Sequence, residues 1–168
     1  MSRLVTKKTS LFGVVVLLAT AAGTMAVNHT GAEEGLRLKT YRDIAGIPTD
    51  CYGETQGAKM GQTFTKAECD AKLLRRLDEF SGKVEACIKQ PMSDKTLVAF
   101  VGLSYNIGSA GFCKSTTARL YNAGSFADAC RAMGAWNKAK VNGVLRPVTG
   151  LTNRRARETA LCLEGLKR

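Results

Sequence analysis

The sequence predicts an α+β fold, with a small β-hairpin sheet lobe and a larger helical lobe joined by a long helix. Two observations support this prediction. Several segments after residue 64 place apolar residues three or four positions apart, which is the spacing of one helix face. Residues 41–52 are instead short, β-prone and broken by Gly46 and Pro48, which indicates a hairpin. The 168 residues suffice for one such domain.

The first 27 residues differ in composition from the rest. Residues 1–10 are basic, residues 11–27 are apolar, and no charged residue occurs between Lys8 and Glu33. This asymmetry favours export of the following domain. Two interpretations stay open: a signal peptide cut after Ala26, or an uncleaved anchor whose helix, about 26 Å long, is shorter than the roughly 30 Å hydrocarbon core. We therefore expect an export segment over 1–27 and a folded domain over 28–168.

The folded domain is expected to start with a helix, or the approach to one, over residues 28–39. This helix should end near Glu34 to Leu38 and lead into the hairpin. Thr65 and Glu68 then form a capping-box pattern that opens the long helix, and Pro91 ends that region. The apolar face of the long helix consists of Leu73, Leu77, Phe80, Val84, Cys87 and Ile88.

The later helices are predicted from their caps and glycine stops. Ser93 caps a helix over residues 94–107 that has little polar surface, so it is expected to be the buried central helix, and Gly108 ends it. Short helices are predicted over 115–122 and 126–133, a loop over 141–149, and a final basic helix from Asn153 to about Glu164.

The positive charge of the chain limits the classes of molecule that it is expected to bind. The formal net charge is +11, and such a surface attracts polyanions. Nucleic acid is one polyanion, but the sequence has no zinc finger, Gly-rich phosphate loop or RNA-binding aromatic motif, and we predict no nucleic-acid partner. Bacterial cell wall, with its acidic peptide stems and phosphates, fits the charge equally well.

The six cysteines are interpreted as disulfides. No Cys-x-x-Cys pair occurs and there is one His, so no metal site is expected. An even number of cysteines after an export segment is typical of an oxidising compartment, and the alternative is a set of buried free thiols in a cytosolic protein. Neighbouring elements tend to pack together, which favours pairing in chain order. The expected pairs are Cys51–Cys69, Cys87–Cys113 and Cys130–Cys162.

Glu34, Asp43 and Thr49 are the candidate chemical groups. Hydrolysis of a sugar bond needs two carboxyl groups in unlike environments, one neutral and one charged. A Glu at the end of a helix and an Asp on the next hairpin would supply both, and the Thr hydroxyl could hold a water. Taken alone, the same residues are also consistent with a surface Glu beside Glu33, a turn Asp and a packed strand Thr.

Further motifs make this spacing specific. Glu34 is followed by Gly-Leu, an Asp nine positions on and a Thr six further, and residues 65–69, 104–108 and 150–162 continue the pattern. With these blocks the chain after about residue 30 resembles the phage-type lysozymes of glycoside hydrolase family 24, which are endolysins that cut cell-wall glycan. The N-terminal segment resembles the signal-arrest-release segments found in this family.

The resemblance implies a lysozyme-like catalytic domain with a glycan cleft between its two lobes. Its activity would be that of a muramidase, cleaving the β-1,4 bond between N-acetylmuramic acid and N-acetylglucosamine. Glu34 would be the general acid, shielded from water by Leu36 and Leu38. Asp43 would stay ionised, and Thr49 would hold the water that attacks with inversion.

The resemblance also implies supporting residues at the cleft. Asn106 and Trp136 match cleft positions, and Arg154 matches a cation that faces the catalytic Glu; a core Trp and a solvated basic face are the alternatives. Glu54 departs from the family, which usually has a structural His there.

No cofactor or metal is implied, and we expect a monomer. Its partners would be peptidoglycan strands and, through the N-terminal segment, the inner membrane, from which it would pass to the periplasm. Two other functions stay open: a lytic transglycosylase acting on the same bond, and a non-catalytic basic protein that binds cell wall.

Overall fold

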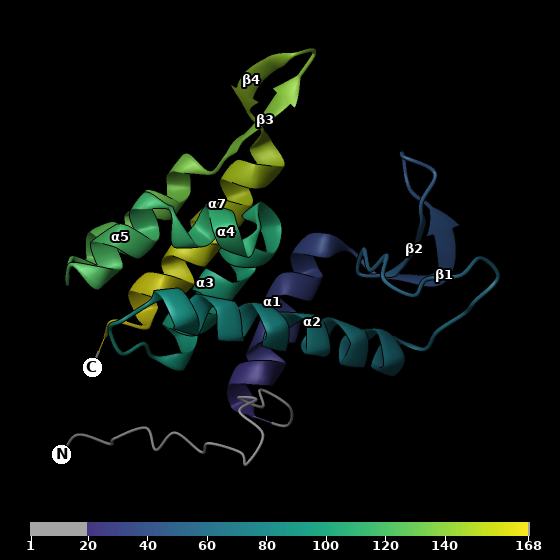
Figure 1. Ribbon diagram of the computed structural model, residues 1–168, viewed down its shortest axis with the longest axis horizontal. Coiled ribbons are helices and arrows are strands. Elements are labelled where there is room, and N and C mark those ends of the chain that lie inside the picture. The colour runs from purple at the N-terminus through teal and green to yellow at the C-terminus, as the bar shows by residue number, and fades with distance from the viewer. Residues whose placement is uncertain (1–19, 168) are drawn as a thin grey trace.

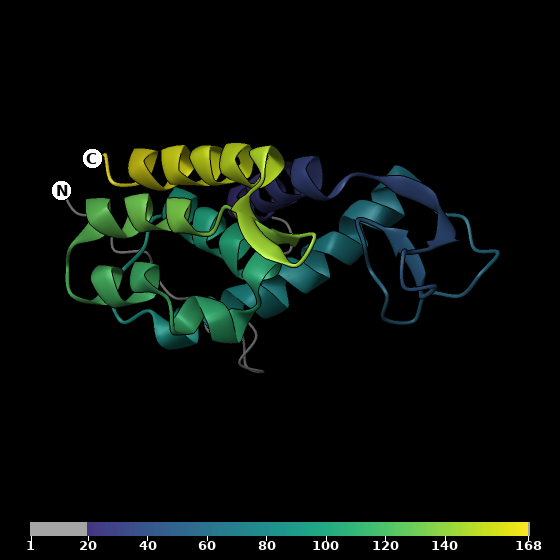
Figure 2. The same cartoon turned by 90° about the horizontal axis from the view of Figure 1, so that it is seen from above.

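The computed structural model describes residues 20–167 and confirms the predicted α+β fold. Figure 1 shows a helical lobe and, beyond the far end of the long helix α2, a small lobe that contains β1 and β2. The view from above in Figure 2 shows the two lobes at opposite ends of an elongated molecule. Residues 1–19, which hold the predicted basic region and most of the apolar run, lie outside the described residues.

Helix α1, Ala21–Glu34, begins earlier than predicted. The hydroxyl of Thr20 caps it by accepting a hydrogen bond from the amide of Gly23 at 3.1 Å. Ala22, Ala26 and Val27 are buried where α1 packs against α2 and α3. The apolar residues that the sequence assigned to the export segment therefore form part of the core. The helix ends at Glu34, within the predicted range of Glu34 to Leu38, and is followed by Gly35, whose φ of 74° is a conformation that favours glycine.

The small lobe contains an antiparallel pair of strands, β1 (Arg37–Arg42) and β2 (Pro48–Cys51), as the β-prone composition predicted. Tyr41 lies opposite Thr49 in the register. The chain after β2 returns along β1, and the amide of Phe64 donates to the carbonyl of Leu38 at 2.8 Å. This return completes the lobe before α2 begins.

Helix α2, Lys66–Cys87, is opened by the predicted capping box. Thr65 Oγ1 accepts from the amide of Glu68 at 3.2 Å, and Glu68 Oε2 accepts from the amide of Thr65 at 2.7 Å. Two ion pairs fix the small lobe to this helix, Lys72–Asp50 at 2.6 Å and Arg76–Glu54 at 3.0 Å. Glu54, which stands where the family usually has a His, thus has a structural partner.

Helix α3, Asp94–Ile107, is the buried central helix that the sequence predicted. It begins at the cap Ser93, ends at Gly108 and contacts α1, α2 and α7. Phe100 lies in an aromatic cluster with Phe112 and Tyr121, with ring centroids 5.4 and 5.1 Å from its own. Four short helical segments follow: α4 (Ser109–Cys113), α5 (Thr116–Asn122), α6 (Phe126–Ala132) and the 3-10 helix η1 (Met133–Ala135). Of these, α4 was not predicted.

The predicted loop over residues 141–149 is wrong, because this region contains a second hairpin, β3 (Lys138–Val141) and β4 (Val144–Pro147). Asn142 and Gly143 form its turn with φ values of 51° and 81°. Asn-Gly is the pair that tolerates two positive φ angles in a two-residue hairpin turn, so the signal was present in the sequence. Helix α7, Thr149–Glu164, then begins four residues before the predicted Asn153.

The three predicted disulfides are all present. They connect β2 to α2, α2 to α4, and α6 to α7. Among residues 20–167 no helix combines the length and apolar character needed to cross a membrane.

Candidate active site

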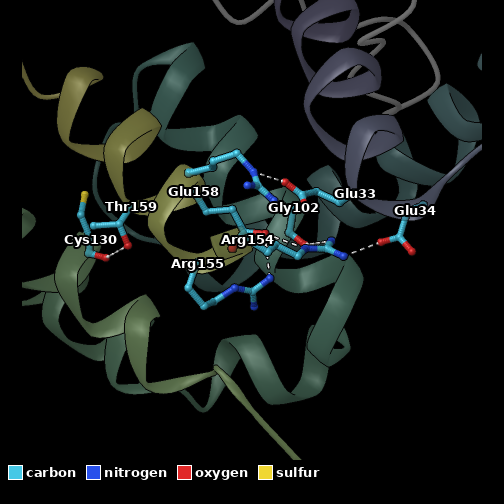
Figure 3. Close-up of polar contacts among 9 residues, drawn as sticks. Glu33, Glu34, Gly102, Cys130, Arg154, Arg155, Glu158 and Thr159 are labelled. Carbon is cyan, nitrogen blue, oxygen red and sulfur yellow. Dashed lines mark hydrogen bonds and ion pairs between the residues drawn. The ribbon is translucent and has the colours of Figure 1, made fainter. Parts of the chain in front are cut away.

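Glu34 is the last residue of α1, and its side chain is 23% exposed. Its Oε1 accepts a hydrogen bond from Nη1 of Arg154 at 2.7 Å, as Figure 3 shows, so the predicted contact between these residues is present. The carboxyl group at the end of α1 thus has a cationic side chain of α7 as its partner.

Arg154 lies in the second turn of α7 and is 5% exposed. Its Nε donates to Oε1 of Glu158 at 3.0 Å, and its Nη2 donates to the carbonyl of Gly102 in α3 at 3.2 Å. Burial by itself would lower the pKa of Arg154, but the carboxylates of Glu34 and Glu158 outweigh burial and raise it. Arg154 is therefore a fixed cation, with separate nitrogens directed at α1, α3 and its own helix.

Glu158 is fully buried beneath this cation. Its Oε1 also accepts from Nη2 of Arg155 at 2.8 Å, while its Oε2 has no hydrogen-bond partner within residues 20–167. Burial raises the pKa of Glu158 to about 7, against the opposing effect of Arg155 and Arg154. Sequence reasoning missed Glu158, although Arg-Arg-x-x-Glu on one helix places the arginines at the i−4 and i−3 positions that can reach it.

Glu33 and Glu34 have different partners although they are adjacent in sequence. Both oxygens of Glu33 accept from Arg157, at 2.6 and 2.8 Å, and this hydrogen bonding lowers the pKa of Glu33. Among the described residues Glu34 has Arg154 alone as a polar partner, through one oxygen. Glu34 is thus the member of the pair with a carboxyl oxygen left for a ligand.

Leu36 and Leu38, which the sequence predicted to shield Glu34 together with the adjoining core, are 38% and 42% exposed, where the chain leaves α1 at Gly35 and enters the small lobe. Their shielding of Glu34 stays a prediction. Tyr105 of α3 lies close enough to Glu34 to be affected by its charge. The pKa of Tyr105 is raised to about 12 by burial and by the negative charges of Glu34 and Glu54. Tyr105 is not among the site residues predicted from the sequence.

Asp43 lies in the turn between β1 and β2. Its Oδ1 accepts from the amides of Ala45 and Ile47, both at 2.9 Å, so one carboxylate oxygen holds the turn. This is the turn role that the sequence offered as the alternative to catalysis. The second oxygen has no such contact among the described residues, and a catalytic role for Asp43 stays a prediction.

Thr49 lies on β2 and is 4% exposed. Its hydroxyl donates to the carbonyl of Ile47 at 3.0 Å, which leaves the lone pairs of Oγ1 as the groups that could hold a water. The role of Thr49 in holding the attacking water also stays a prediction.

Asn106 and Trp136 lie at the ends of elements on the helical side. Asn106 is exposed one turn after Gly102, whose carbonyl accepts from Arg154. Trp136 follows η1 and is 38% exposed, so it is not a core residue. Figures 1 and 2 both show the C-terminal end of α1, and hence Glu34, between the β1–β2 lobe and the β3–β4 hairpin.

Comparison with known proteins places this geometry in context. Residues 31–158 match the family model described as phage lysozyme. The SAR-endolysin of Pseudomonas phage phiKMV is 36% identical over 149 residues, which is 88% of each chain. Among solved structures, the endolysin from Escherichia coli O157:H7 phage FAHEc1 has 33% identity and a TM-score of 0.77, over 89% of this chain and 95% of that chain. The muramidase domain of SpmX from Asticaccaulis excentricus has 30% identity and a TM-score of 0.78, over 83% and 95%.

Proposed function

The chain belongs to the phage lysozyme family, and from that premise we propose that it is a muramidase, which hydrolyses the β-1,4 bond between N-acetylmuramic acid and N-acetylglucosamine in peptidoglycan. The observation that carries the proposal is the position of Glu34. It ends α1 between the two projecting hairpins, with one oxygen held by the buried cation Arg154. A carboxyl group held in a fixed orientation, with one oxygen left for a ligand, is what general acid catalysis of glycoside hydrolysis requires.

In this mechanism Glu34 gives its proton to the bridging oxygen of the glycan. Arg154 stabilises the carboxylate that remains after the transfer, and Glu158 and the Gly102 carbonyl keep Arg154 in place. Asp43 would act as the anionic partner through its second oxygen. Thr49 would hold the water that attacks the sugar from the opposite face, with inversion.

A pair of adjacent substitutions tests the proposal. Glu34→Gln keeps the size of the side chain but replaces the acid with an amide that cannot protonate the leaving oxygen, so we expect muramidase activity on purified peptidoglycan to fall at least about 100-fold. Glu33→Gln is the matched control, because it removes one negative charge from the preceding position, and we expect it to stay within a few-fold of the parent. Full activity in Glu34→Gln would refute the proposal and favour a non-catalytic wall-binding protein.

The products of the reaction separate hydrolysis from the transglycosylase alternative. Hydrolysis adds a water and leaves a reducing muramic acid end, whereas a transglycosylase leaves an anhydro end. We expect the mass of the released fragments to include the added water. Anhydro ends alone would retain Glu34 as the acid but replace the hydrolytic reaction.

We also propose that the protein is exported with its N-terminal segment intact and is held at the inner membrane until release. Cleavage after Ala26 would remove the first six residues of α1, including the buried Ala22 and Ala26. Residues in a bilayer cannot pack against α2 and α3 at the same time. Tethering would therefore keep α1 from docking and Glu34 from reaching Arg154. N-terminal sequencing of the periplasmic protein tests this, and a start at residue 27 or later would contradict it.

A further inference from the structure

The outer half of the β3–β4 hairpin carries three exposed aliphatic side chains. Val141, Val144 and Leu145 are 43%, 51% and 61% exposed. They occupy the two residue pairs next to the turn, because Val141 lies opposite Val144 and Lys140 lies opposite Leu145. The two strands pack mainly against each other, and Figure 1 shows the hairpin projecting from the helical lobe. Aliphatic groups exposed together on a projection indicate a surface for a partner with an apolar part.

Three cations follow these aliphatic groups toward the base of the hairpin. Lys140 is in the second residue pair from the turn, Arg146 in the third and Lys138 in the fourth. All three are exposed, and they form no ion pair with any residue of the range 20–167. The sequence has no Asp or Glu between Asp128 and Glu158, so no acid of the same segment neutralises them. Their charge is therefore available to an anionic partner.

The order of these groups along the hairpin corresponds to the layers of an anionic bilayer. A strand rises about 3.4 Å per residue, so the two outer residue pairs extend over roughly 7 Å. Interfacial segments bury their apolar groups to a depth of about 5–10 Å, at the boundary between headgroups and acyl chains. Cations on long aliphatic stems then reach the lipid phosphates. The polar backbone of the turn limits the contact to this interface, because hydrocarbon offers it no hydrogen-bond partner.

We infer that the β3–β4 hairpin docks on an anionic phospholipid bilayer, with its three aliphatic side chains in the interface and its three cations against lipid phosphates. The hairpin and the start of α1 lie on opposite sides of the helical lobe (Figure 1), so this contact is separate from the N-terminal segment. A second copy of the chain is a poorer occupant, because two such hairpins would bring like charges together. The inference goes beyond the proposed muramidase activity and does not depend on it.

Amide hydrogen exchange of the full chain tests this inference at the hairpin itself. Exchange is measured peptide by peptide, so binding of lipid through the N-terminal segment is recorded separately from binding through residues 138–147. We expect vesicles of mixed phosphatidylglycerol and phosphatidylcholine to slow exchange in residues 138–147 by at least about threefold, and vesicles of phosphatidylcholine alone to slow it much less. No slowing with the mixed vesicles, or equal slowing with both kinds, would overturn the inference.

Two variants of the hairpin separate the contributions of charge and apolar contact. The triple change Lys138→Gln, Lys140→Gln and Arg146→Gln should raise the lipid concentration for half-maximal slowing by at least about tenfold, since each cation near an anionic surface contributes about fivefold in affinity. The double change Val141→Thr and Val144→Thr keeps the β-branched shape of both side chains and removes apolar surface, so it should raise that concentration by about tenfold. An unchanged lipid requirement in either variant would contradict the proposed contact.

The matched control removes the same charge outside the hairpin. Lys89, Lys114 and Arg119 are exposed and form no ion pair with the described residues, so their triple change to Gln should keep the lipid requirement of the parent. A loss equal to that of the hairpin variant would assign the effect to net charge and overturn the inference. So would slowing of the hairpin by purified peptidoglycan and not by vesicles, which would assign the surface to the cell wall. Failure of the proposed muramidase is detected separately, by activity in Glu34→Gln.

Discussion

Arg154 is shared between two carboxyl groups that differ in their access to solvent. Glu34 is partly exposed at the end of α1, and Glu158 is buried one helical turn after Arg154. Because Arg155 and Arg154 are both buried next to Glu158, the acid compensates charge that water does not reach. Glu158 is a positioning residue on this geometry, since it contacts Arg154 and is itself fully buried.

Removal of Glu158 should therefore destabilise the fold. At pH 8 we expect Glu158→Ala to lower the free energy of unfolding by about 3–5 kcal/mol, since it leaves buried arginines without their partner. Urea denaturation measures the change. Glu164→Ala on the same helix is the control: Glu164 pairs with Lys95 at the exposed surface, where water screens the charges, so its loss should have a much smaller effect. Similar effects of both substitutions would contradict the account of the buried cluster.

The titration of Glu158 predicts the pH dependence of stability. Burial raises its pKa in the folded protein from 4.5 to about 7, so the folded state retains a proton that the unfolded state has lost. Stabilisation from this proton is complete below the unfolded value of 4.5 and is lost as the pH rises through about 7. The unfolding free energy of the parent should thus fall relative to that of Glu158→Gln between pH 5 and pH 8, roughly the span of the shift. Denaturant titrations at several pH values would show it, and a relative rise would be inconsistent with a raised pKa.

Glycines in a helix and in a hairpin turn contribute differently to the stability of this protein. Gly82 lies in the exposed face of α2, and a methyl group there would meet no atom within 4 Å. Gly143 is in the β3–β4 turn with a φ of 81°, where an L side chain is strained. The same substitution should therefore have opposite effects in these two elements.

Two alanine variants check this contrast. Gly82→Ala should raise the unfolding free energy by about 0.5–1 kcal/mol, because alanine loses less backbone entropy in a helix. Gly143→Ala should lower it by about 1 kcal/mol, since it forces a positive φ. Thermal or urea unfolding of the two proteins gives the signs. A stabilising Gly143→Ala would show that the turn does not need its left-handed residue.

At the scale of the whole molecule, α1 and α2 connect the two lobes. A disulfide and ion pairs fix the small lobe to α2. Cys51–Cys69 ties the strand that bears Thr49 to the start of α2, and the Lys72–Asp50 pair lies beside it. The predicted site residues are divided between the lobes, with Asp43 and Thr49 on one and Arg154 on the other. Their positions relative to one another thus depend on this attachment.

Loss of that disulfide should weaken both the fold and the activity. The double change Cys51→Ser and Cys69→Ser removes a link between residues 18 apart in sequence. We expect a loss of about 3 kcal/mol in unfolding free energy. Amide hydrogen exchange should become faster in β1 and β2 but stay slow in α3, and muramidase activity should fall. Equal acceleration in both lobes would mean that the disulfide stabilises the molecule uniformly and does not act on the small lobe.

Local signals determined much of the architecture. Caps at Thr65 and Ser93, the glycine stop at Gly108 and the apolar periodicity of α2 all act between residues a few positions apart, so the sequence alone located α2 and α3. The disulfide pairing followed from the packing of neighbouring elements. The Asn142–Gly143 turn was equally local, and its hairpin was missed because the flanking strands are short and exposed.

The tertiary structure decided which of two environments the first apolar residues occupy. Composition assigned Ala22, Ala26 and Val27 to an export segment, and only packing against α2 and α3 shows that they can fill the core of the folded domain. The contact between Glu34 and Arg154 joins residues 120 positions apart, and its prediction came from a family resemblance. Glu158, which holds Arg154 there, emerged from the structure alone. Periodicity and caps report interactions along one segment, whereas the environment of a charge depends on which distant segments bury it.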